Sequence, residues 1–172
     1  MDHDLQRYLN DHLAGSNGAL LLIQHFIDTM NESEARDDFI LLKKSVENDR
    51  ALLEHLIASA GLDTSAVANA AGDLAARVGF LKLMWEGFET GGLGLFEGLE
   101  MLALGIQGKS LLWLSLREIS SWYPEWNEVD FSKLEMDAIE QRDSVEFWRI
   151  EAARDILPSV ERRAAATVAT TA

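Results

Sequence analysis

The sequence predicts an all-α fold in which four long helices form a bundle. Apolar residues recur at spacings of three and four along four segments, each about 26 to 28 residues long. The chain has 172 residues, which suits one domain. Its only two prolines, Pro124 and Pro158, each follow one of the four segments. No segment has the strict apolar–polar alternation of a β-strand.

The first two segments predict an antiparallel helical hairpin. One helix is expected from about residue 4 to residue 30, and the polar residues Asn31, Glu32 and Ser33 interrupt it. The next helix is expected over about 34–60. Gly61 follows it, and glycine is the residue that most readily takes the left-handed conformation after a helix. Because so few residues join them, the two helices should lie side by side in opposite directions.

The second half of the chain predicts another hairpin, which is reached through a long crossover. An Ala-rich helical piece is expected over 63–85, followed by a glycine-rich break, GFETGGLG. A helix over about 93–120 and another over about 131–157 then flank the loop SSWYPEWNEVD, in which Asp130 is a suitable N-cap.

These elements divide the chain into two parts. Residues 1–158 should form the bundle, and residues 159–172 should form a flexible C-terminal tail because they include few core-forming side chains.

One long crossover between two hairpins is the connection of ferritin-like folds. In the length, order and connection of its helices, the stretch 4–158 resembles the ferritin-like superfamily, a four-helix bundle here carrying an extra helical crossover segment. The resemblance implies a di-iron site built from two glutamates and two Glu-x-x-His motifs. This chain has no Glu-x-x-His, since leucines (Leu9, Leu22 and Leu52) stand three residues before its last three histidines. We therefore expect a ferritin-like scaffold without the di-iron motif and without a resident cofactor.

Composition narrows the classes of function. The chain carries 29 acidic and 15 basic residues, a formal net charge of −14, which disfavours nucleic acid and anionic membrane surfaces as partners. It has no cysteine, so disulfides, thiolate metal sites and cysteine nucleophiles are excluded. The start, MDHDLQRYLNDH, lacks the basic and apolar regions of a signal peptide. We expect a soluble cytoplasmic protein.

Two histidines of the first helix raise the question of a metal site. At 100° per residue, His12 and His25 lie about 140° apart around the helix, so they cannot share a metal ion. His12 falls on the apolar face with Ile23 and Phe26, whereas His25 falls on the reverse side. The pattern predicts an interior His12 and an outward His25.

A buried polar network is expected in the middle of the bundle. Asp49 interrupts the apolar stripe of the second helix, and a carboxylate buried there needs a counter-charge or a metal ion. The expected partners are Arg142, Lys109 and His12, in that order, because the planar fork of arginine suits a buried carboxylate best.

These features lead us to expect a non-enzymatic binding or structural module. One alternative is an iron oxidoreductase or storage protein that holds iron or another divalent metal at an atypical carboxylate site. That site would use some of Asp49, Glu97, Glu100, Glu140 and His12. A third possibility is a small-molecule binder, with a pocket between helices around His12 and Trp113.

The helix expected over 93–120 has two further features. Gly94, Gly98 and Gly105 lie on one side of it, which predicts close packing against a neighbouring helix in preference to a dimer seam. The helix is also apolar on its other side, so either the crossover or a second subunit should cover it (Met101, Leu104, Leu111 and Leu112). The expected assembly is a homo-oligomer, a dimer.

Overall fold

The computed structural model describes residues 3–31, 33–62, 92–159 and 161–162, and no β-strand occurs among them. Four long helices account for most of these residues: α1 (His3–Thr29), α2 (Glu34–Ser59), α5 (Gly92–Ile119) and α6 (Phe131–Ile156). Two short 3₁₀ helices, η1 (Ser120–Trp122) and η2 (Pro124–Trp126), join α5 to α6. The all-α prediction is confirmed. The helical piece expected over 63–85 and most of the expected tail lie outside the described residues.

Local side chains set several of the helix ends. The Ser33 hydroxyl accepts a hydrogen bond from the Arg36 backbone N–H and so caps the start of α2. The Asp130 carboxylate accepts one from the Lys133 N–H, at 2.9 Å, and caps the start of α6. Past the end of α2, Gly61 has a φ of 67°. Only glycine takes that conformation without steric cost, so the chain turns there.

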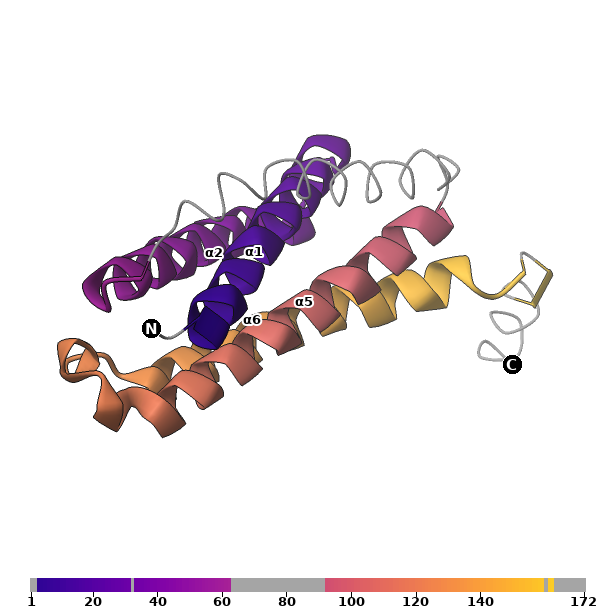
Figure 1. The fold of residues 1–172 in the computed structure, drawn as a ribbon. Helices are drawn as coiled ribbons and strands as arrows, with labels where there is room; N and C mark the ends of the chain where they lie inside the picture. Colours follow the sequence, from indigo (N-terminus) through magenta and orange to yellow (C-terminus); the bar gives the residue numbers. More distant parts are fainter. Residues whose placement is uncertain (1–2, 32, 63–91, 160, 163–172) are drawn as a thin grey trace.

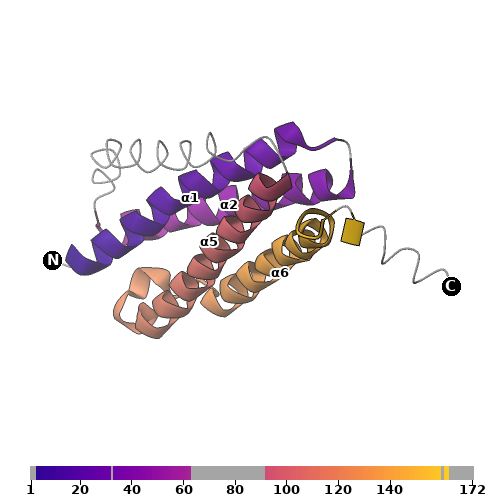
Figure 2. The same ribbon diagram turned by 90° about the vertical axis from the view of Figure 1, so that its right-hand side faces the viewer.

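The helices form two antiparallel hairpins, α1 with α2 and α5 with α6, that pack across each other (Figure 1). The buried residues show how the hairpins are matched. The C-terminal halves of α2 and α5 share one core cluster, and their N-terminal halves share another. Helices α2 and α5 therefore run in the same direction, as Figure 2 also shows.

The two core clusters occupy opposite ends of the bundle. One is built around Trp113 and Trp126, and the other around Phe26 and Phe39. Trp126 is fully buried, and its indole N–H donates a hydrogen bond of 3.1 Å to the backbone oxygen of Leu56. That bond fastens the aromatic loop after α5 onto the end of α2. Trp122 in the same loop is 73% exposed.

The outer side of α5 is only partly covered. Leu112, expected behind the apolar stripe, is instead buried in the core, whereas Leu104 is 72% and Leu111 51% exposed. Met101 is partly buried. Coverage of Leu104 and Leu111 by the crossover segment, which lies outside the described residues, or by a second subunit stays a prediction. None of the described helices combines the length and the apolar character needed to cross a bilayer.

The glycines of α5 differ in their surroundings. A Cβ built on Gly98 would lie 3.0 Å from Cζ of Phe26, so the predicted close packing of helices is confirmed there. A Cβ on Gly105 would meet no atom of the described residues within 4 Å, and among them the same prediction is wrong at that position.

Substitution by alanine should separate these two glycines. Gly98→Ala should lower the free energy of unfolding by about 1–2 kcal/mol, because the tightly placed Phe26 ring must move. Gly105→Ala should raise it by about 0.5–1 kcal/mol, because alanine is the better helix former and nothing obstructs its methyl group. Urea unfolding of both variants measures the difference. Equal effects of the two substitutions would contradict the α1–α5 packing.

Candidate ligand-binding cleft

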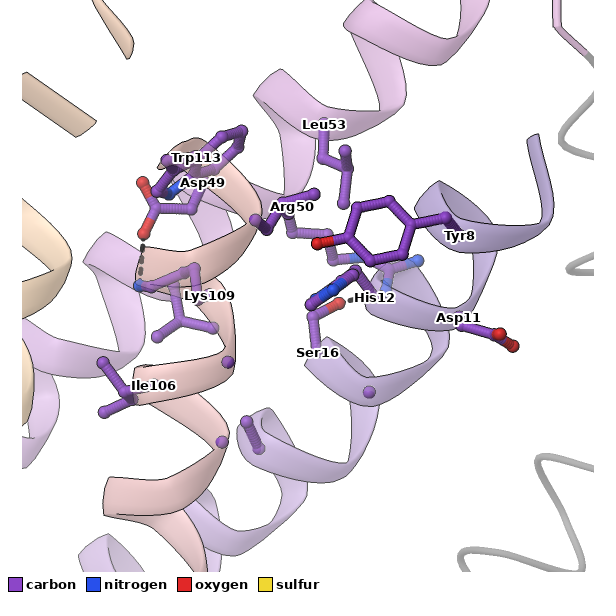
Figure 3. Close-up of a pocket in the computed structure, with 16 residues that line it drawn as sticks. Tyr8, Asp11, His12, Ser16, Asp49, Arg50, Leu53, Ile106, Lys109 and Trp113 are labelled. Carbon is purple, nitrogen blue, oxygen red and sulfur yellow. Dashed lines mark hydrogen bonds and ion pairs between the residues drawn. The ribbon is translucent and has the colours of Figure 1, made fainter. Parts of the chain in front are cut away.

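A cleft of about 480 Å³ opens between α1, α2 and α5. Figure 3 shows its walls: Tyr8, His12 and Ser16 come from α1, and Ile106 and Lys109 come from α5. Most of the lining is apolar, including Val46 and Leu53 of α2 and Leu112 and Trp113 of α5. This volume lies within the range of small-molecule sites, about 300–1,000 Å³.

Three glycines in helix interiors line the cleft: Gly15, Gly105 and Gly108. Among the described residues, a Cβ built on any of them would meet no atom within 4 Å, so none is required for close packing there. Glycine within a helix lowers stability by about 0.5–1 kcal/mol relative to alanine. The cleft is therefore open partly because side chains are missing at positions where alanine would fit.

A layer of polar side chains lies next to the cleft, between the two core clusters. The Lys109 ammonium donates a hydrogen bond of 2.5 Å to Asp49 and another to the side-chain oxygen of Gln141. The side chains of Lys109 and Asp49 are only 14% and 15% exposed. This arrangement connects α5 to both α2 and α6.

Arg142 is not the partner of Asp49, contrary to the expected order. Its guanidinium donates instead to the side-chain oxygen of Gln107, at 2.5 Å, and to Asp143. The reason is angular. Gln141 points at the Asp49–Lys109 pair, and the next residue in a helix projects about 100° away from it.

Burial lowers the pKa of Lys109, and the neighbouring Asp49 carboxylate opposes that shift. The ammonium thus depends on Asp49 to keep its charge in a poorly solvated position.

His12 lines the cleft but is not part of the polar layer. Its ring packs edge-on against Tyr8, with 4.7 Å between the ring centres. Burial lowers its pKa, with a smaller opposing effect from Asp11. His25 is exposed, as its angular separation from His12 predicts. The pocket predicted around His12 and Trp113 lies in the same place as this cleft, because both residues line it.

The sequence did not reveal the role of Arg50. One nitrogen of its guanidinium donates to three oxygens of α1: the backbone oxygen of Leu13, the Ser16 hydroxyl and the Asn17 side chain. Its other terminal nitrogen pairs with Glu54 at 2.9 Å. Periodicity offered no signal for this contact, since it depends on how α1 and α2 meet. Through these hydrogen bonds, Arg50 connects the polar layer to α1 as well.

Trp113 lines the cleft, but its indole nitrogen is buried in the core. The residue is 1% exposed, and its indole nitrogen has no hydrogen-bond partner among the described residues. The nitrogen itself has almost no accessible surface. A buried N–H without an acceptor costs about 1–3 kcal/mol.

The carboxylates of the alternative metal site do not converge. Asp49 is paired with Lys109, and Glu100 lies 3.3 Å from Arg149. Glu140 and Asp49 both border an acidic groove between α2 and α6. Glu97 lies near the start of α5 and does not line that groove. In the described part of the chain, no three His, Asp or Glu side chains are grouped to hold a metal ion. The Lys109 ammonium also opposes a cation beside Asp49.

The chain was compared with protein families, curated proteins and solved structures. No protein-family model, curated protein or solved structure matches this chain.

The Asp49–Lys109 pair should show a strong energetic coupling. Lys109→Met alone leaves a nearly buried carboxylate without a counter-charge and should lower the free energy of unfolding by about 2–4 kcal/mol. Replacing both residues, as in Asp49→Leu with Lys109→Met, should cost much less. A double-mutant cycle on urea unfolding gives the coupling. The matched control is the more solvent-exposed pair Lys43–Glu47, 2.8 Å apart within α2, for which about 0.3–0.5 kcal/mol is expected. A coupling no larger than the control's would contradict a structural role for the layer.

His12 should make folding stability depend on pH in a defined direction. Because burial lowers its pKa, the unfolded chain binds a proton more readily than the folded protein. Stability from a neutral His12 is fully present above about pH 6.5, the unfolded pKa, and is lost as the pH falls toward the folded pKa. The loss should not exceed about 1.4 kcal/mol per pH unit. Unfolding of the wild type and His12→Gln between pH 8 and pH 5 measures it. The exposed His25→Gln is the control, and an unchanged pH dependence in His12→Gln would refute the assignment.

Proposed function

We propose that this protein is a non-enzymatic binding module built on a ferritin-like bundle, with a small-molecule site in the cleft between α1, α2 and α5. The polar layer takes the place in the bundle that a di-iron centre has in the superfamily the chain resembles. Its role here is structural: it holds the helices that form the cleft.

The three glycines of the cleft carry this proposal. Gly15, Gly105 and Gly108 each weaken a helix, and each has room for a methyl group among the described residues. Where stability alone matters, such positions gain from substitution by alanine. Their meeting at one cleft, from two different helices, is the arrangement expected of a site kept open for a ligand at the expense of stability.

The polar groups of the cleft support binding over catalysis. The Ser16 hydroxyl donates to the backbone oxygen of Leu13 and accepts from Arg50, so it is held by the scaffold. Asp49 and Lys109 are engaged with each other. A nucleophile needs a base within hydrogen-bonding reach, and no such pair lines the cleft among the described residues.

Filling the cleft should abolish the binding of an apolar probe without unfolding the protein. The probe is N-phenyl-1-naphthylamine, an uncharged fluorophore that brightens in apolar surroundings. In Gly108→Leu the new side chain enters the cleft, so the affinity should fall at least tenfold. Stability should not fall, because leucine is the better helix former. Fluorescence titration and urea unfolding measure the two quantities.

The control for this experiment is Leu104→Gln. Leu104 belongs to the same helix but is exposed outside the cleft. This variant should bind the probe as the wild type does, with about one probe per chain. The proposal fails if the wild type does not bind the probe, or if only Leu104→Gln weakens binding, which would place the probe on the outer surface.

A further inference from the structure

Two ring side chains of α1 bring polar atoms into the cleft. Figure 3 shows the Tyr8 hydroxyl and the His12 ring extending from α1 toward α5. The two rings pack edge-on, with 4.7 Å between their centres, and this contact holds the imidazole in place. His12 is therefore a fixed polar group in the wall of the cleft.

The His12 imidazole has hydrogen-bonding capacity that the protein does not use. No hydrogen bond joins it to another residue in the part of the chain that the structure describes. The ring is partly exposed, and neither of its nitrogens is enclosed in the way that the Trp113 nitrogen is. A molecule in the cleft can reach it.

The other polar groups of the lining are engaged within the protein. Lys109 donates to Asp49 and Gln141, and Arg50 donates to oxygens of α1 and pairs with Glu54. These contacts leave no counter-charge for a charged ligand, which would lose its hydration on entering. The cleft favours an uncharged molecule.

A carboxylate at the edge of the cleft does not change this conclusion. Asp11 is exposed and points away from the cleft in Figure 3. Burial lowers the pKa of His12, and the smaller effect of Asp11 opposes it. The imidazole is therefore favoured in its neutral form at neutral pH.

Neutral imidazole sets the chemistry of the ligand's polar group. One ring nitrogen donates a hydrogen bond and the other accepts one. A hydroxyl both donates and accepts, so it can pair with either nitrogen, whereas the oxygen of a ketone or ester only accepts. A primary amide also does both, but it loses more hydration in an apolar site. A hydroxyl group is thus the best match for His12.

We infer that the cleft takes an uncharged, mainly apolar alcohol or phenol whose hydroxyl pairs with the His12 imidazole. This inference rests on the proposed function and adds to it the class of ligand and the residue that selects it.

Four planar probes of similar shape test the ligand class. They share a naphthalene ring and differ at position 2: a hydroxyl, a methyl group of nearly the same size, a carboxylate and an amidinium. Both charged probes should bind at least about tenfold more weakly than 2-naphthol, because the cleft offers them no counter-charge. Isothermal titration with the full chain at neutral pH, where 2-naphthol is uncharged, measures all four.

The variant His12→Phe tests the selecting residue. It keeps an aromatic ring beside Tyr8 and removes both nitrogens, so the hydroxyl of 2-naphthol loses its partner. The affinity of 2-naphthol relative to 2-methylnaphthalene should therefore fall about tenfold from the wild type to His12→Phe. Urea unfolding shows whether the variant folds. The matched control is His25→Phe on the exposed side of α1, which should leave the ratio unchanged.

A second measurement needs no substitution in the protein that binds. The imidazole nitrogens of His12, one of four histidines, give ¹⁵N signals that the spectrum of His12→Phe identifies. In the wild type these signals should shift much more with 2-naphthol than with 2-methylnaphthalene, because only the first probe forms a hydrogen bond to the ring. Equal shifts with the two probes would contradict the pairing.

The outcomes separate the two proposals. Tighter binding of either charged probe, or an unchanged affinity ratio in folded His12→Phe, would overturn the inference while leaving the cleft as the binding site. A ratio that falls in Tyr8→Phe and not in His12→Phe would overturn it as well, because the Tyr8 hydroxyl would then be the partner. If Gly108→Leu leaves the binding of every probe unchanged, the cleft is not the site, and the proposed function fails with the inference.

Discussion

The pairing of Lys109 with Asp49 and Gln141 is the contact on which the arrangement of the helices depends. Lys109 stands between the core residues Ile106 and Leu112 of α5, where an ammonium is poorly solvated. Its two partners come from α2 and α6, so three helices must meet at one level to satisfy it. Sliding any of them by a helical turn would leave a charge buried and unpaired, at a cost of several kcal/mol. Apolar packing alone tolerates such shifts far better. The polar layer therefore fixes the register of the bundle.

The same layer explains how an open cleft can exist beside a well-packed core. Arg50, next to Asp49 in sequence, fastens α2 to α1 at the level of Leu13 and Ser16. Helix α1 is then held on one side of the cleft by directional hydrogen bonds, and it touches α5 closely at Gly98 and Phe26. Between these fixed points, Gly15, Gly105 and Gly108 leave space. Stability is concentrated in the layer and in the two cores, and openness is confined to the cleft.

The layer also bears on the chemistry that such a bundle can support. Carboxylates that ligate a metal ion must converge and remain free of other cations. Here the central carboxylate is taken by an ammonium, and Arg149 lies beside Glu100. The binding of an apolar molecule needs less, namely an apolar surface in a partly enclosed cleft. The described residues that line the cleft supply such a surface.

The sequence by itself determined the helices. Their ends follow from local chemistry, such as the Ser33 and Asp130 caps and the left-handed Gly61, and periodicity placed Asp49 among core residues. It also required some cation for Asp49, but it did not select Lys109 over Arg142. That choice depends on which face of α6 meets α2 and α5, and this is a property of the packed helices. The anchor at Arg50, the burial of Leu112 and the open space at Gly105 were decided in the same way. Each depends on the distance and rotation between helices remote in sequence, and a pattern along one helix does not contain that information.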